Sequence, residues 1–267
     1  MVAGATSGIG RAIAEGLARR GASVVLHGRD SSRGDAVVQA IQGDGGVARF
    51  VAADLADSDQ VQQLAADAGD VDILVHSAGV YVFVPTTHTD AASFDRQIAV
   101  NMRAPLLLVA ALVPEMARRR HGSIVLIGSG SARTPAAVGA AYGASEAGTE
   151  MLARYWASGF GPSGVRVNAV SPGAVHTEGT AAMLGEHTAV LDGSNARGRA
   201  GDPNEIANAV CFLLGPASSY VNSAVLAADG GESSARWRSR LSGLAPDLAV
   251  SGGGGEDLVA AGPPGCV

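Results

Sequence analysis

The sequence contains no lysine, and all 19 of its basic residues are arginine. Its 25 acidic residues outnumber them, so the formal net charge is -6 and the pI is near 5.5. This balance excludes a broad positive surface of the kind that grips nucleic acid or acidic lipid. We therefore expect small molecules as partners, and any chemistry that needs a side-chain ammonium group has no lysine to supply it.

Cysteine is also scarce, with Cys211 inside an apolar run and Cys266 at the C-terminal end. Two such residues exclude a disulfide framework and indicate a reducing compartment, for which the cytoplasm is our expectation. The longest apolar run, Leu106 to Val113, is too short to span a bilayer, and the N-terminus has no signal-like core. We expect neither membrane insertion nor export.

Two kinds of site are missing from the sequence pattern. His, Cys and carboxylate residues nowhere have convincing metal-ligand spacing, and no Ser-His-Asp order with a nucleophile elbow occurs. The sequence thus predicts no metal centre and no hydrolase triad.

What the sequence does have is a regular alternation of two patterns. Hydrophobic residues make up 47% of the 267 residues and charged residues 16%, enough to bury the core of one α/β domain. Short β-branched runs predict strands at 24–27, 73–76, 123–127 and 165–170. Helical patterns rich in Ala and Leu lie around them, at 9–20, 32–42, 57–68, 94–119 and 140–160. Such repeated βαβ units predict a doubly wound parallel sheet.

Both ends of the chain depart from this alternation. A strand before Gly4 has only Met1 to Ala3, whereas a central strand usually has about five residues, so we expect the first strand to be truncated. From 232 to 267 the composition turns to Gly, Ser and Pro, which cannot bury enough apolar surface to fold. We expect a disordered tail there, with a short helix at 236–244 as an alternative.

The glycine turn Gly4-Ala-Thr-Ser-Gly8-Ile-Gly10 follows the strand stub and opens an amphipathic helix. It places bare backbone amides at a helix N-terminus, where an anionic pyrophosphate can bind and where glycine allows close approach. The alternative is an ordinary strand-to-helix turn. The strand before it and the helix after it favour the dinucleotide site.

Further motifs follow in a fixed order along the chain: Asp54, His76-Ser-Ala-Gly79, Asn101, Ser129, Tyr142, Asn168-Ala-Val-Ser-Pro-Gly173 and Asp229-Gly-Gly231. Together with the glycine turn they resemble the classical short-chain dehydrogenase/reductase family. The resemblance implies a single Rossmann-type domain over 1–231 that binds a dinucleotide. It also implies hydride transfer between a nicotinamide cofactor and a ketone or secondary alcohol.

By this resemblance a defined set of residues contacts the cofactor. Asp54 and Leu55 would face the adenine, and Ala78 and Gly79 the adenosine ribose. The glycine turn and the segment after Asn168 would hold the pyrophosphate and the nicotinamide, through Gly4, Thr6, Ser7, Gly8, Ile9, Gly10, Pro172, Gly173, Val175 and Thr177. As alternatives, Asp54 could cap the next helix and Asn168 could satisfy a strand end. Ser77 replaces the family's usual asparagine, which would weaken hydrogen bonds between the central strands.

The residues that end the second strand favour NADP(H) over NAD(H). Leu26-His-Gly28-Arg29 has no carboxylate where one would grip an adenosine 2'-hydroxyl and repel a 2'-phosphate. Arg29 can pair with such a phosphate, although a solvated surface arginine is an alternative. Ser7 supplies no second cation from the glycine turn.

At the chemical end, the resemblance assigns Ser129 and Tyr142 to the carbonyl oxygen and Asn101 to a water for proton relay. The family's lysine, four residues after the tyrosine, is Glu146 here, and neither Arg133 nor Arg154 has the right helical position to replace it. A unit charge ~5 Å away at a dielectric of ~20 is worth roughly 3 kcal/mol. That corresponds to roughly two pKa units, so the carboxylate would make the phenol a poorer acid unless burial keeps Glu146 protonated.

Two functions therefore remain open from the sequence. The first is an NADP(H)-dependent reductase or dehydrogenase whose activity Glu146 weakens. The second is a catalytically deficient paralogue that binds the dinucleotide and a ligand or partner subunit. In either case the family suggests a mobile lid between Gly173 and Arg199, with Met183, Leu184 and Val190 as an apolar wall and with His176 and His187 in the lid or at the surface. It also suggests a homotetramer or homodimer through the helices of Asn101 and Tyr142.

Overall fold

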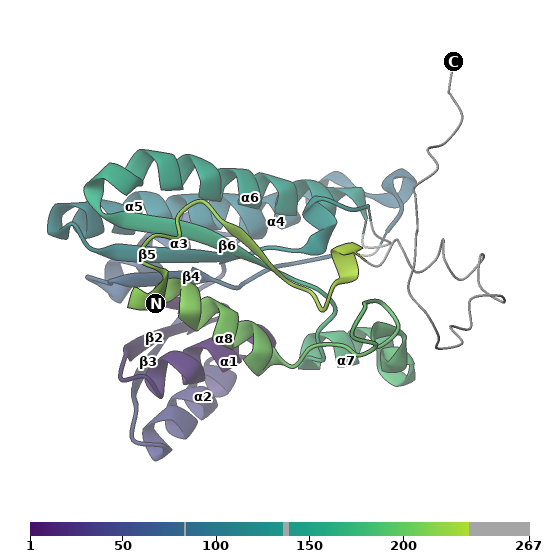
Figure 1. The fold of residues 1–267 in the computed structure, drawn as a ribbon, viewed down its shortest axis with the longest axis horizontal. Coiled ribbons are helices and arrows are strands. Elements are labelled where there is room, and N and C mark those ends of the chain that lie inside the picture. Colours follow the sequence, from purple (N-terminus) through teal and green to yellow (C-terminus); the bar gives the residue numbers. More distant parts are fainter. Residues whose placement is uncertain (83, 136–138, 235–267) are drawn as a thin grey trace, which may run out of the picture. The chain divides into compact units, whose positions relative to one another are not determined.

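A parallel sheet of seven strands organises the protein (Figure 1). The computed structural model describes residues 1–82, 84–135 and 139–234. The strands lie in the order β3-β2-β1-β4-β5-β6-β7. Strands are thus added on one side of β1 up to β3 and on its other side from β4 onward. Their bounds are β1 Val2–Ala3, β2 Ser23–Gly28, β3 Val47–Ala52, β4 Ile73–His76, β5 Gly122–Ile127, β6 Val165–Pro172 and β7 Val225–Ala228. The predicted doubly wound Rossmann-type sheet is confirmed, and the two-residue β1 pairs with both β2 and β4.

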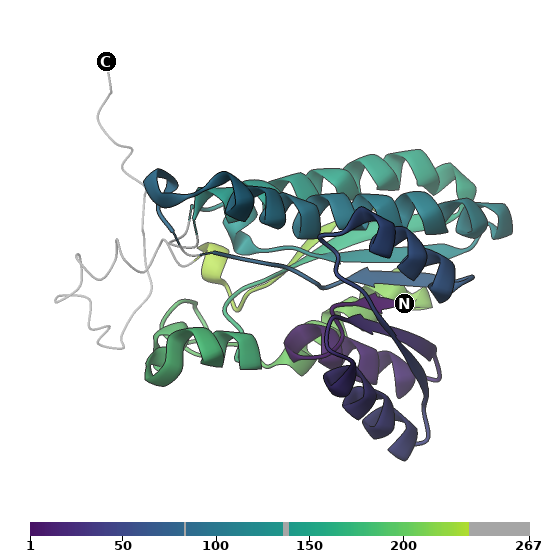
Figure 2. The same cartoon turned by 180° about the vertical axis from the view of Figure 1, so that it is seen from behind.

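Helices cover both faces of the sheet (Figure 1, and from behind in Figure 2). One apolar core joins the sheet to α1 Gly8–Ala18, α2 Ser31–Gly43 and α8 Pro203–Leu214. The other joins it to α3 Ser58–Ala68, α5 Ala104–Arg119 and α6 Ala140–Phe160. The sequence of β5 is continuously apolar because both of its faces are buried: Ile124 and Leu126 enter one core, and Val125 enters the other.

Aspartates set the starts of four helices. The carboxylate of each accepts N–H groups of the first turn, at α2, α3, α8 and the short helix α4 Ala91–Ile98; the capping residues are Asp30, Asp57, Asp202 and Asp90. Helix α3 is therefore capped by Asp57, and the alternative that Asp54 caps it is wrong. Asn168 does satisfy a strand end, since it accepts from Ala224 N and donates to Val221 O, at 2.9 and 3.0 Å.

The single helix predicted at 94–119 is interrupted by a π-helical turn, η2 Ala99–Arg103, between α4 and α5. Pro105 has no N–H to give to the carbonyl of Asn101, four residues earlier, so the regular α-helical bond is missing. Thr149 Oγ1 donates to that carbonyl instead, at 2.9 Å. The stretch Ala91–Arg119 is long and apolar enough to cross a membrane by length and composition alone, and 56% of the 18-residue window that meets this test is buried inside the fold.

The described chain ends in the turn η7 Glu232–Ser234. Glu232 Oε2 accepts from the backbone N–H of Ala174, 3.2 Å away, so the first residues of the expected tail contact the domain. The rest of that tail, 235–267, and the alternative helix at 236–244 lie outside the described residues.

Candidate active site

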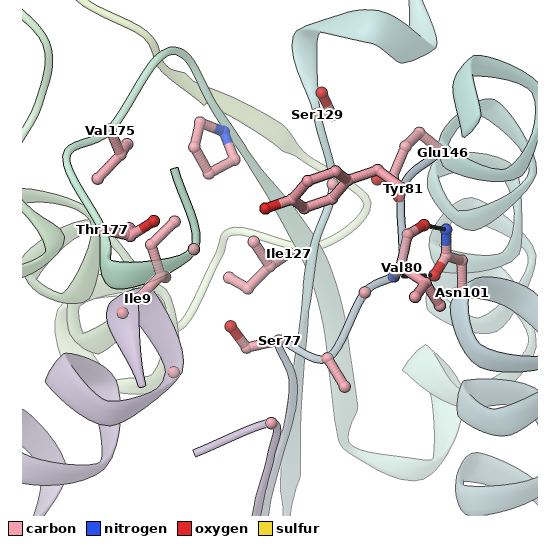
Figure 3. A pocket seen from close by; sticks show the side chains of 18 of the residues that line it. Ile9, Ser77, Val80, Tyr81, Asn101, Ile127, Ser129, Glu146, Val175 and Thr177 are labelled. Atoms are coloured by element: carbon pink, nitrogen blue, oxygen red, sulfur yellow. Dashed lines mark hydrogen bonds between the residues drawn. The ribbon is translucent and has the colours of Figure 1, made fainter. Parts of the chain in front are cut away.

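A cavity of about 900 Å³ opens at the carboxyl ends of the strands. This is the edge where a doubly wound sheet places its ligands. Every residue that the sequence assigned to cofactor binding or chemistry lines this cavity. Figure 3 shows Ile9, Val175 and Thr177 on one wall and Asn101 and Glu146 on the opposite wall, with Tyr81 projecting between them.

The glycine turn is shaped for a ligand that approaches the backbone closely. A Cβ on Gly10 would stand 2.0 Å from the carbonyl oxygen of Gly4, and Gly4 itself has a φ of +80°. Both positions therefore exclude other residues. Ser7 at the N-cap of α1 makes no side-chain capping bond, which leaves the first amides of the helix directed at the cavity. These features fit the pyrophosphate of a dinucleotide.

Acidic side chains at the adenosine end have partners of their own. Asp54 lies at the cavity, where it accepts from Ala56 N at 3.0 Å and approaches Arg96 at 3.6 Å. Asp30 directly follows Arg29, but its carboxylate accepts from Ser32 N and Arg33 N. Arg29 lines the cavity on this turn, and the carboxylates of Asp30 and Asp54 are held by hydrogen bonds within the fold.

Asn101 links the loop after β4 to helix α6 by hydrogen bonds. Its Oδ1 accepts from Val80 N and its amide group donates to Val80 O, both at 2.9 Å (Figure 3). The amide group also donates to Ser145 Oγ at 2.9 Å. The side chain is 3% exposed. Both amide hydrogens of Asn101 are thus engaged, so a relay water could be held only through a remaining lone pair of this residue. Its role in proton relay stays a prediction.

Ser129 and Tyr142 lie at the same end of the cavity. Ser129 follows β5, and Tyr142 is in the first turn of α6. Burial raises the pKa of the Tyr142 phenol, the charge of Glu146 adds to the rise, and a hydrogen bond with Ser129 opposes it. Tyr81, which the sequence did not single out, packs edge-on against Tyr142 with ring centroids 5.9 Å apart. The phenol is therefore a weak acid in this site.

Two buried glutamates follow Tyr142 on one face of α6. Glu146 is 4% exposed, and burial, reinforced by the charge of Glu150, raises its pKa to about 8. Glu150 instead receives both nearby cations: Arg133 at 3.0 Å and Arg154 at 3.8 Å. Arg133 also donates to Ser171 Oγ at 2.9 Å. The two arginines nearest in sequence are thus committed to Glu150, whose role sequence reasoning missed.

Comparison with known proteins places this arrangement in a family. A family model described as enoyl-(acyl carrier protein) reductase matches residues 4–233. A solved structure described as a short chain dehydrogenase/reductase family protein is 44% identical, with a TM-score of 0.81 over 86% of this chain and 94% of that one. The chain belongs to the classical short-chain dehydrogenase/reductase family.

Curated members of this family are similar to the chain over most of its length. Cis-4-hydroxycyclohexanecarboxylate dehydrogenase of Sinomonas cyclohexanicum is 36% identical over 86% of this chain and 94% of its own. D-threitol dehydrogenase of Mycolicibacterium smegmatis is 36% identical over 86% and 91%. A 3-oxoacyl (acyl-carrier-protein) reductase of Agrobacterium tumefaciens C58, solved with NADP bound, is 33% identical with a TM-score of 0.82 over 86% and 92%.

The segment that the sequence suggested as a lid forms α7 Glu178–Leu184 and the turn η5 Gly185–Leu191; its role as a lid stays a prediction. Leu184 and Val190 line the cavity, whereas the His187 side chain is exposed. His176 is 48% exposed at its side chain and lies 3.1 Å from Asp192, within the lid. An ion pair between Arg33 of α2 and Glu178 of α7 ties the lid to the adenosine side.

Proposed function

We propose that this short-chain dehydrogenase/reductase transfers hydride between NADP(H) and a ketone or secondary alcohol, with turnover weakened by Glu146. The observation that supports it is that Ser129 and Tyr142 line the same cavity as the glycine turn. Relatives named as dehydrogenases of small cyclic or linear alcohols support the substrate class. We also propose that the protein is located in the cytoplasm.

In this proposal the residues of the chain perform the binding and the proton transfer. The nicotinamide, when bound, supplies or accepts the hydride. Ser129 and Tyr142 hold the carbonyl oxygen, and Tyr142 Oη delivers the proton in reduction or accepts it in oxidation. A raised pKa of the phenol slows both directions, because the acid is weaker and the phenolate that serves as base is scarcer.

A second candidate is a dinucleotide-binding paralogue without turnover. It is motivated by Glu146 and by the pairing of Arg133 and Arg154 with Glu150, which leaves no cation on the tyrosine in the part of the chain that the structure describes. The test is NADPH oxidation across a panel of ketones, together with calorimetry of both dinucleotides. Turnover supports the enzyme, uptake without turnover supports the paralogue, and no uptake of either dinucleotide overturns both.

Replacing Arg29 by alanine should weaken NADPH binding while sparing NADH. A charge-assisted bond is worth about 1.5–3 kcal/mol, so the Kd for NADPH should rise about tenfold or more and that for NADH less than about twofold. Calorimetry with each dinucleotide measures this. Arg118→Ala is the matched control, because Arg118 is exposed on α5 and pairs with Glu115. Equal losses for both dinucleotides would remove Arg29 from 2'-phosphate recognition.

We further propose a homodimer or homotetramer through α5 and α6. Leu106, Met151 and Tyr155 are 43%, 47% and 72% exposed on these helices and would supply apolar contacts between copies of the chain. Light scattering of the full chain should give a dimer or tetramer mass, and Tyr155→Glu should shift it toward the monomer. A monomer at all concentrations would overturn this arrangement.

A further inference from the structure

The carboxyl group of Glu146 occupies an unusual position in the wall of the cavity. It is 4% exposed, and its Oε2 has no hydrogen-bond partner among the described residues. Its Oε2 lies 3.8 Å from the place that a Cβ on Gly128, the residue after β5, would take. A buried carboxylate without partners is strongly disfavoured, whereas a carboxylic acid is tolerated and can donate.

The charges around Glu146 do not supply a cation. On its own helix, Tyr142 lies one turn before it and Glu150 one turn after it. The segment after β5 contributes Arg133, which bonds to Glu150 and Ser171. The residue after β5, Gly128, carries no charge, and the loop after β4 contributes Tyr81 to the same cavity. The negative charge at 150 is thus balanced by arginines, whereas no cation among the described residues pairs with 146, which leaves a proton to neutralise it.

The place of Glu146 along the cavity identifies what it would meet. The glycine turn at the other end fits the pyrophosphate, so the nicotinamide half of a bound dinucleotide would extend toward Ser129, Tyr142 and Glu146. The polar groups of that half beside the ring are the vicinal hydroxyls of its ribose, whose oxygens accept hydrogen bonds. A protonated carboxyl aimed into the cavity can give one.

We propose that Glu146 is held as a neutral carboxylic acid and binds the dinucleotide by donating a hydrogen bond to its nicotinamide ribose. This rests on the proposed function, because it requires a dinucleotide in the cavity. The bond consists of an O–H group given to an acceptor oxygen, and no proton is transferred. Above neutral pH the acid ionises, the donor is lost, and an unbalanced carboxylate faces the ligand.

The consequence is a cofactor affinity that declines with pH. The pKa of Glu146 is raised to about 8, so the binding form predominates below that value and is lost above it. One pH unit above such a pKa only about a tenth of the group keeps its proton, which lowers affinity about tenfold. Binding in this range should also take up a proton, which calorimetry detects as a dependence of the heat on the ionisation enthalpy of the buffer.

The experiment measures the Kd of NADH by calorimetry between about pH 6 and pH 9.5, because NADH lacks a 2'-phosphate that titrates in the same range. For the native chain Kd should rise about tenfold from pH 7 to pH 9. The Glu146→Gln variant keeps a neutral donor at every pH, so its Kd for NADH should change by less than about twofold over the same range. Tyr142→Phe should keep the native decline, which separates the carboxyl from the phenol.

The failures of the two proposals are distinguishable. A native Kd that stays flat, or a decline that persists in Glu146→Gln, overturns the role of Glu146 and leaves the dinucleotide site intact. Absence of uptake at neutral pH overturns the proposed function itself. Circular dichroism of both variants across the same pH range confirms that a loss of binding is not a loss of fold.

Discussion

Replacing Glu146 by lysine is expected to raise the rate of ketone reduction by about 10- to 100-fold. An ammonium group one helical turn from the phenol shifts its pKa downward by roughly two units, the reverse of the shift that the native surroundings impose. Proton transfer by a well-matched acid contributes about 10²- to 10⁴-fold, so part of that factor should return. Stopped-flow or steady-state oxidation of NADPH over a panel of ketones measures it.

The control for this gain is Glu146→Gln, which removes the acid without adding a cation. If the glutamine variant gains as much as the lysine variant, relief of the carboxyl rather than the new ammonium group is responsible. The affinity for the dinucleotide should be measured in parallel at neutral pH, so that a change in turnover is not confused with a change in saturation. If the native chain already reduces ketones as fast as its lysine variant, the electrostatic account is refuted.

Among the side chains assigned to the chemistry, Tyr142 should show the largest loss of turnover when it is replaced, here by phenylalanine. The substitution removes the only phenol assigned to the proton, so turnover should fall about 10²- to 10⁴-fold, while the Kd of the dinucleotide changes less than about threefold. Tyr81→Phe is the matched control, since it deletes the other phenol and keeps the edge-on ring contact. Single-turnover kinetics with saturating NADPH separate chemistry from binding. Equal losses in the two variants would mean that Tyr142 is not the donor.

The pH profile of the native chain gives a second reading of the same residue. Because burial and the charge of Glu146 raise the pKa of Tyr142, alcohol oxidation, which uses the phenolate as base, should keep accelerating with pH beyond about 10. In the lysine variant this limb should move to lower pH. If the oxidation rate rises over the same pH range in the native chain and in the lysine variant, residue 146 does not affect the pKa of the phenol.

Much of the nucleotide-binding half was readable from the sequence. Strand runs such as 123–127 are apolar on both faces because both faces are covered, and the glycine turn is specified by backbone contacts that admit no side chain. The aspartate caps and Pro105 also carry local signals. The break of the helix 94–119 at η2 was missed, although the proline that causes it stands in the sequence.

The electrostatics of the chemical half were not readable in the same way. That Glu146 is buried without a partner, while Glu150 takes Arg133 and Arg154, depends on which elements pack together after folding. The edge contact of Tyr81 with Tyr142 likewise joins a loop to a helix about 60 residues away. Sequence spacing gives the neighbours on one helix face, but not those that arrive from another strand.

The two ends of the cavity differ in how much change they can absorb. At Gly4 and Gly10 of the glycine turn an added Cβ would collide with backbone, 2.6 Å from Ala78 and 2.0 Å from Gly4 respectively, so we expect larger residues there to disrupt the fold. At position 146 the buried side chain lines the cavity, and its Oε2 takes part in no hydrogen bond among the described residues. Under the proposed function, a lineage with this architecture can change its turnover through one exchange on α6, while the glycine turn that fits the pyrophosphate remains fixed by its backbone contacts.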